Sequence, residues 1–132
     1  MRNVILIFAI LCMVIFAIVG LTFLFIPEGV LSFFNFFSRM LNIREMPVTF
    51  PGFYLILSVA YMYIVTVISF FIYRDPENPL PLFLLANAKI ASSLLSLLLI
   101  FLDGFYLIYL VNLIIDGLIG LLSFYFYKKV KK

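Results

Sequence analysis

The chain lacks histidine altogether and contains a single cysteine, Cys12, among its 132 residues. Because histidine and cysteine supply the nitrogen and sulfur ligands of most zinc-type sites, we predict no metal site. A lone cysteine also cannot form an intramolecular disulfide. The nucleotide-binding P-loop, the nucleophile elbow and the zinc-peptidase motif are missing too. Acid–base chemistry would fall to Lys89, Asp116 or Glu28, so we favour a non-enzymatic protein and predict no catalytic residue and no cofactor.

Charged residues are also scarce, because they make up 11% of the chain whereas hydrophobic residues make up 67%. Soluble domains are about one quarter charged and about half apolar, so the composition excludes a soluble fold. A membrane-spanning helix needs about 20 apolar residues, and the chain supplies four such runs. We predict one all-α, polytopic membrane domain over residues 1–132, folded as a four-transmembrane-helix bundle. Its helices are expected at about 4–26, 53–73, 80–102 and 105–127.

The breaks between these runs carry proline, glycine or charge. Pro27 ends the first run, the stretch RDPENPLP separates the second from the third, and Asp103-Gly104 predicts a tight turn before the fourth. The first run follows a positive start, as a signal peptide would, but it is far longer than a signal core of about 7–15 residues. We therefore expect a helix that is retained in the protein.

The basic residues are distributed unevenly about the predicted spans. With four spans, Arg2, Arg74 and the four lysines near the C-terminus fall on one side, and only Arg39 and Arg44 on the other. The positive-inside rule then predicts a multi-pass protein of the cell membrane with both termini in the cytoplasm. The lysine cluster is typical of an anchor near anionic lipid, so the net charge of +3 does not indicate nucleic acid.

An amphipathic segment at about 29–45 connects the first two spans. Its polar residues recur at helical spacing, with phenylalanines and aliphatic residues between them: Glu28, Ser32, Asn35, Arg39 and Asn42. This pattern predicts a helix in the outer membrane interface, with its polar stripe facing water and its apolar face down. It would act as a connector that covers the outer end of the bundle, or as a gate that moves when a lipid or partner binds.

Lys89 and Asp116 are the polar residues least expected inside a membrane. Lys89 precedes the turn residue Asp103 by 14 positions and Asp116 follows it by 13. If the last two spans are antiparallel, both residues lie at one depth, roughly 20 Å from the turn in a core of about 30 Å. An unpaired charge there costs ~2.5–3.5 kcal/mol, which favours pairing.

Helical phase adds polar neighbours to this pair. The predicted ligand-binding set joins the third span, the fourth span and one tyrosine of the second: Lys89, Asp116, Asn112, Ser92, Ser93, Ser96, Asn87 and Tyr61. Gly117 and Gly120 would let the last two helices approach closely. Three interpretations remain open: Lys89 reaches the headgroups with its long side chain, it forms a structural ion pair with Asp116, or the cluster contacts a ligand, ion or partner.

Several short stretches and the four-span layout resemble the small DoxX-like membrane proteins of bacteria. They are PEGVL at 27–31, PGFY at 51–54, RDP at 74–76, and the lysine in the third span, Lys89. The resemblance covers nearly the whole chain, and its motifs are not strict signatures. It implies a compact bundle, often an accessory to a redox or lipid-related process, and it transfers no active site to this chain.

We therefore predict a small integral membrane protein that binds a lipid-like amphipathic ligand or a partner helix at the polar cluster. Its partners would be membrane lipids, another membrane protein or further copies of the chain. One alternative is an oligomeric channel or carrier subunit with Lys89 and Asp116 in an ion or proton pathway. Another is an enzyme that acts on a lipid-like substrate, which would need a deep cavity between the helices.

Overall fold

The computed structural model describes residues 1–48 and 52–132, which form five α-helices and no β-strand. The helices are α1 (Arg2–Phe25), α2 (Pro27–Met40), α3 (Gly52–Arg74), α4 (Pro79–Leu102) and α5 (Leu107–Lys131). The predicted all-α class is thereby confirmed. All of these helices except α2 are long and apolar enough to cross a membrane. Helix α2 has 14 residues and is about 21 Å long, too short to span a hydrocarbon core of about 30 Å.

The helix boundaries follow from local chemistry. Pro27 has no N–H to continue α1, and it occupies the first turn of α2 instead. Asn78 caps α4, because its side-chain oxygen accepts a hydrogen bond of 3.0 Å from the Leu80 N–H. Gly104 adopts a φ of +134°, which glycine tolerates best, at the predicted turn between α4 and α5. The start of the PGFY stretch, Pro51, lies outside the described residues.

Three predicted helix ends were wrong. Helix α5 begins at Leu107 and not at 105, because Tyr106 before it is extended, and it continues through the lysines to Lys131. Helix α2 ends at Met40 rather than near 45. Asn42 takes the left-handed conformation with a φ of 54°, and the Ile43 N–H then donates to the Ser38 carbonyl at 2.9 Å. This pattern terminates helices, and asparagine is one of the few residues that adopt it.

The prediction that the polar stripe of α2 faces water was wrong for Asn35, which is buried. Its side-chain nitrogen donates to the Met46 carbonyl at 2.8 Å, and its oxygen accepts from the Met46 N–H at 2.9 Å. The chain after α2 folds back along the helix, so its main chain replaces water as the partner of the amide. Large apolar side chains of α2 are exposed beside its polar residues, including Phe33, Phe36 and Met40.

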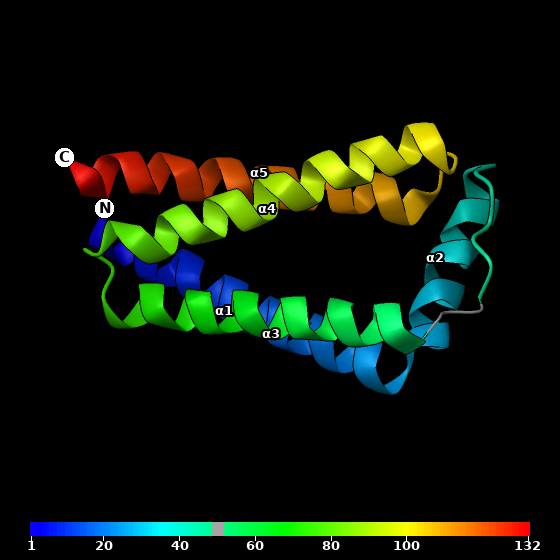
Figure 1. Cartoon of the computed structure of the whole chain (residues 1–132), viewed down its shortest axis with the longest axis horizontal. Helices are drawn as coiled ribbons and strands as arrows, with labels where there is room; N and C mark the ends of the chain where they lie inside the picture. Colours follow the sequence, from blue (N-terminus) through cyan, green and yellow to red (C-terminus); the bar gives the residue numbers. More distant parts are fainter. Residues whose placement is uncertain (49–51) are drawn as a thin grey trace.

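The four long helices form two antiparallel pairs, α1 with α3 and α4 with α5 (Figure 1). Within each pair the contacts are extensive, whereas fewer contacts join α3 to α4. Both termini lie at one end of the molecule, hereafter the terminal end, and α2 crosses the opposite end, hereafter the α2 end. The ribbons of the two pairs lie close together at the terminal end and diverge toward the α2 end.

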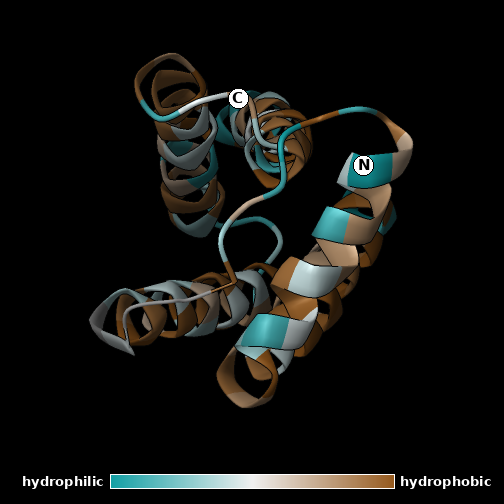
Figure 2. Cartoon of the chain, turned by 90° about the vertical axis from the view of Figure 1, so that its right-hand side faces the viewer, coloured by the Kyte–Doolittle hydropathy of each residue, from teal (hydrophilic) through white to brown (hydrophobic). Residues whose placement is uncertain are grey.

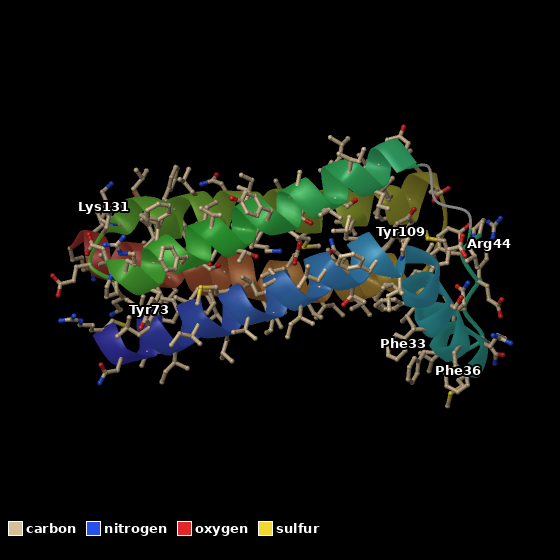
Figure 3. All side chains as sticks on the ribbon, turned by 90° about the horizontal axis from the view of Figure 1, so that it is seen from below. Phe33, Phe36, Arg44, Tyr73, Tyr109 and Lys131 are labelled. Atoms are coloured by element: carbon tan, nitrogen blue, oxygen red, sulfur yellow. The ribbon has the colours of Figure 1, made fainter. Side chains whose placement is uncertain are left out.

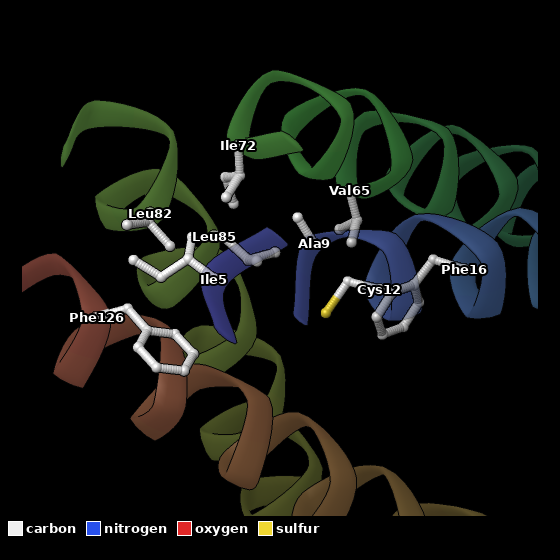
Figure 4. Packing of buried hydrophobic residues seen from close by; sticks show 9 residues of the cluster. All are labelled: Ile5, Ala9, Cys12, Phe16, Val65, Ile72, Leu82, Leu85 and Phe126. Carbon is white, nitrogen blue, oxygen red and sulfur yellow. The ribbon is translucent and has the colours of Figure 1, made fainter. Parts of the chain in front are cut away.

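The hydrophobic core lies in the half of the molecule near the terminal end (Figure 4). Helix α1 contributes a stripe at helical spacing, namely Ile5, Ala9, Cys12 and Phe16. Val65 and Ile72 of α3, Leu82 and Leu85 of α4, and Phe126 of α5 complete it. The rings of Phe8 and Phe126, 5.2 Å apart between centroids, connect α1 directly to α5.

The outward faces of the long helices are as apolar as the core. Large hydrophobic side chains such as Ile7, Ile64, Leu95 and Leu121 are more than half exposed, and hydrophobic colouring predominates along the long helices (Figure 2). Soluble monomers rarely expose continuous apolar surface on this scale. Four apolar helices with this surface fit a small multi-pass membrane protein.

Candidate functional site

Lys89 of α4 and Asp116 of α5 form an ion pair inside the molecule. The Lys89 Nζ donates to the Asp116 Oδ1 at 3.0 Å, and the two side chains are 0% and 4% exposed. The spacing of both residues about the turn at Gly104 correctly predicted that they meet. The interpretation in which Lys89 reaches the headgroups does not fit this geometry, because its amine is enclosed between helices.

Two aromatic rings from the other helix pair complete the surroundings of the Lys89 amine. The Nζ atom lies 3.5 Å from the ring centroid of Phe16 in α1 and 5.1 Å from that of Tyr61 in α3. An ammonium group is attracted to the negative face of such a ring, most strongly where water is excluded. The hydroxyl of Tyr61 also donates to the Ala88 carbonyl of α4 at 3.2 Å. Lys89 and Tyr61 thus connect the two helix pairs.

The close approach of α4 and α5 beside the ion pair depends on two glycines. A Cβ atom at Gly120 would lie 2.7 Å from Ile90 Cγ1 and 3.1 Å from the Ile90 backbone nitrogen. At Gly117 it would lie 3.0 Å from the Ser93 Oγ. With glycine at both positions, the Ser93 hydroxyl reaches across and donates to the Leu113 carbonyl at 2.7 Å. The expected role of small residues in bringing these helices together is confirmed.

A second polar group lies one helical turn from Asp116. The side-chain nitrogen of Asn112 donates to the Ser92 Oγ at 3.0 Å and to the Ser96 Oγ at 2.7 Å. These bonds fix the orientation of the amide, and its Oδ1 accepts no hydrogen bond within the described chain. Asn112 is half-buried, and no described side-chain atom is both buried and unpaired. The unpaired Oδ1 is therefore not fully buried.

The structure brings together seven of the eight predicted site residues and leaves out Asn87. The Asn87 side chain is exposed on α4 and donates to the Phe83 carbonyl of its own helix at 2.8 Å. Two residues along an α-helix rotate the side chain by about 200°, so Asn87 and Lys89 lie on nearly opposite faces. Its proposed place in the cluster was wrong for that reason.

Sequence reasoning also missed Phe16, whose ring is the aromatic group nearest to the Lys89 amine. The signal was weak, because Phe16 is one of 17 phenylalanines. Its position does continue the buried row Ile5, Ala9 and Cys12 at spacings of four, three and four residues. This row marks the inward face of α1, but it does not reveal which residue of α4 the face meets.

Neither of two hollows in the described chain is lined by Lys89 or Asp116. The first lies between α2 and the start of α5, where Leu31 and Asn35 face Tyr106, and it leaves no room for a water molecule. Arg44 adds to this contact, since its guanidinium carbon lies 5.5 Å from the Tyr106 ring centroid. Helix α2 therefore packs tightly over the end of the molecule. The second hollow lies at the terminal end.

Within residues 1–48 and 52–132, no group of three histidine, cysteine, aspartate or glutamate side chains could hold a metal ion. Comparison of the chain with protein-family models, curated proteins and solved structures gives no match. The candidate site consequently has to be interpreted from its own geometry.

Proposed function

We propose that the chain is a non-enzymatic, multi-pass protein of the cell membrane that binds the polar head of a lipid-like ligand beside the Lys89–Asp116 pair. The observation that carries this proposal is the unpaired Oδ1 of Asn112, whose orientation Ser92 and Ser96 fix. An unpaired amide oxygen at membrane depth is unfavourable, because lipid tails offer no hydrogen-bond donor. A ligand that donates a hydrogen bond there removes that cost.

The surroundings of Asn112 suit a ligand with an apolar body. Asn112, Ser92 and Tyr61 are half-buried. An acyl or isoprenoid chain could lie along the exposed apolar surface of α4 and α5, which includes Leu95 and Ile115, with its head at the amide. Because the free atom of Asn112 is an acceptor, the head must carry a donor such as a hydroxyl group.

The enclosure of Lys89 favours binding over the alternative functions. Catalysis or ion conduction through Lys89 and Asp116 needs a substrate, ion or water to reach them, and their side chains are 0% and 4% exposed. The pair serves instead as a fixed support for the neighbouring polar groups. As part of this proposal, the resemblance to DoxX-like proteins suggests an accessory role in a lipid-related or redox process.

The ligand proposal predicts a shift in thermal stability with donor-bearing lipids. Monoacylglycerols and quinols should raise the Tm of the detergent-solubilised protein by about 5 °C at roughly ten times their Kd. Fatty-acid methyl esters and quinones, which have no donor, should leave it unchanged. Asn112→Ala should abolish the shift.

Asn87→Ala is the matched control, since it removes the same amide from the outer face of α4. It should respond to monoacylglycerols as the wild type does. If no donor-bearing lipid stabilises the wild type, or if Asn112→Ala responds equally, the ligand proposal is wrong. A change in oligomeric state on Asn112→Ala would then indicate that a second copy supplies the donor.

The proposed orientation predicts opposite labelling of two positions. In a Cys12→Ala background, Ser32→Cys on the exposed surface of α2 should react with a membrane-impermeant maleimide in intact cells. Lys132→Cys, at the terminal end, should react only after the membrane is permeabilised. The reverse pattern would place the termini outside the cytoplasm.

A further inference from the structure

The hollow at the terminal end lies where three segments of the chain meet. With a volume of about 430 Å³, it is bounded by the start of α1, the α3–α4 loop and the last turns of α5. That volume is within the range of about 300–1,000 Å³ typical of small-molecule sites. Its lining side chains are polar at Arg2, Lys129 and Glu77, and apolar at Met1, Ile5, Pro76 and Val130.

The charges of the hollow favour an anion. Arg2 and Lys129 form no ion pair, because the pairs present in residues 1–48 and 52–132 are Arg39–Glu45 and Lys89–Asp116. Lys129 instead lies over the Tyr125 ring, with its Nζ 5.6 Å from the centroid. The terminal end also carries Arg74 and three further lysines, and Lys131 marks it in Figure 3. An anion with several oxygens could accept hydrogen bonds from both basic side chains that line the hollow.

The apolar lining indicates what the anion is attached to. Ile5 and Pro76 are buried, and Ile5 belongs to the hydrophobic core. The helix surfaces beside the hollow expose aliphatic residues, including Val4 and Leu80. A phosphate whose glycerol lies on the apolar lining could extend its acyl chains along these surfaces. The Glu77 carboxylate accepts hydrogen bonds, which suits a headgroup with hydroxyl donors.

We infer that this hollow is a binding site for an anionic phospholipid with a hydroxyl-bearing headgroup, of which phosphatidylglycerol is the simplest example. Arg2 and Lys129 contact the phosphate, and Glu77 accepts from the headgroup hydroxyls. This inference uses the membrane location proposed above and is independent of Asn112. It goes beyond a general attraction of lysines to anionic lipid, because it assigns the contact to two of the cations at this end.

A charge-matched pair of double variants tests the assignment in the full chain. Arg2→Gln/Lys129→Gln removes both basic side chains that line the hollow, and Arg74→Gln/Lys131→Gln removes two basic side chains outside it at the same end. Phosphatidylglycerol is titrated as a minor component of uncharged detergent micelles, and binding is counted by native mass spectrometry. The lining variant should bind about tenfold more weakly, and the control variant less than about threefold more weakly.

Each further measurement either supports or overturns the inferred phospholipid site. Equal loss in both double variants would show diffuse attraction to the terminal end and overturn the site. Inorganic phosphate that competes with the lipid at equal concentration would show that free phosphate, and not a lipid, is the ligand. Phosphatidylcholine should bind neither variant nor the wild type at this site. Asn112→Ala should keep wild-type affinity for phosphatidylglycerol, so failure of the proposed function would leave this result unaffected.

Discussion

Replacing Asp116 with leucine is expected to lower the free energy of unfolding by about 3–5 kcal/mol, the largest effect we predict for a single substitution. The substitution leaves the Lys89 ammonium enclosed between four helices without a counter-charge. The rings of Phe16 and Tyr61 remain, but a cation–π contact contributes only about 1–2 kcal/mol. Unfolding of the purified protein in mixed micelles, followed by circular dichroism, measures the change.

The double variant Lys89→Met/Asp116→Leu distinguishes the loss of the whole ion pair from the exposure of one unpaired buried charge. Replacing a buried ion pair by apolar residues of similar size is often neutral or stabilising, so the double variant should regain most of the lost stability. Arg39→Gln is the control for an ion pair at the surface, because the Arg39 and Glu45 side chains are 68% and 44% exposed. It should cost less than about 1 kcal/mol. If Asp116→Leu is no more harmful than Arg39→Gln, the pair does not support the fold.

Gly120→Val should lower the free energy of unfolding by about 1–3 kcal/mol, as overpacking of a tight contact does. Its Cβ would meet Ile90 at 2.7 Å and the Lys89 Cβ at 3.4 Å, so α4 and α5 must separate beside the ion pair. The backbone nitrogen of Ile90, 3.1 Å away, cannot move without moving the helix. Thermal unfolding of the same micellar preparation tests this expectation.

The matched control is Gly52→Val at the start of α3, where a Cβ atom would have no neighbour within 4 Å. It carries the same change of residue without the steric contact, so its Tm should stay within about 2 °C of the wild type. Gly117→Ala should lie between the two, since its Cβ meets only the Ser93 side chain, with the Oγ at 3.0 Å and the Cβ at 3.9 Å. If the three substitutions changed the Tm by the same amount, the α4–α5 contact would accommodate the added side chain without loss of stability.

The candidate site was predictable where its residues are close along the chain. Lys89 and Asp116 belong to helices joined by a short turn, so counting residues from Asp103 places them at one depth, and helical phase adds Asn112, Ser92 and Ser96. The prediction for Asn87 was wrong because two residues that are close in sequence can lie on opposite faces of a helix. The contacts of Phe16 and Asn35 were not predicted, for another reason. Their partners, Lys89 and Met46, are selected by how distant segments pack, and no local pattern contains that information.

The sequence by itself determined that four apolar helices form, that breaks with proline, glycine or charge separate them, and that the last two bring a cation to an anion. These features depend on hydrophobic length, backbone conformation and the 3.6-residue period, which act over a few turns of chain. The tertiary structure alone decided that α1 pairs with α3, that aromatic rings from this pair enclose Lys89, and that α2 turns its phenylalanines outward. Those outcomes depend on the rotation of each helix about its axis, which side-chain packing sets among helices far apart in the chain.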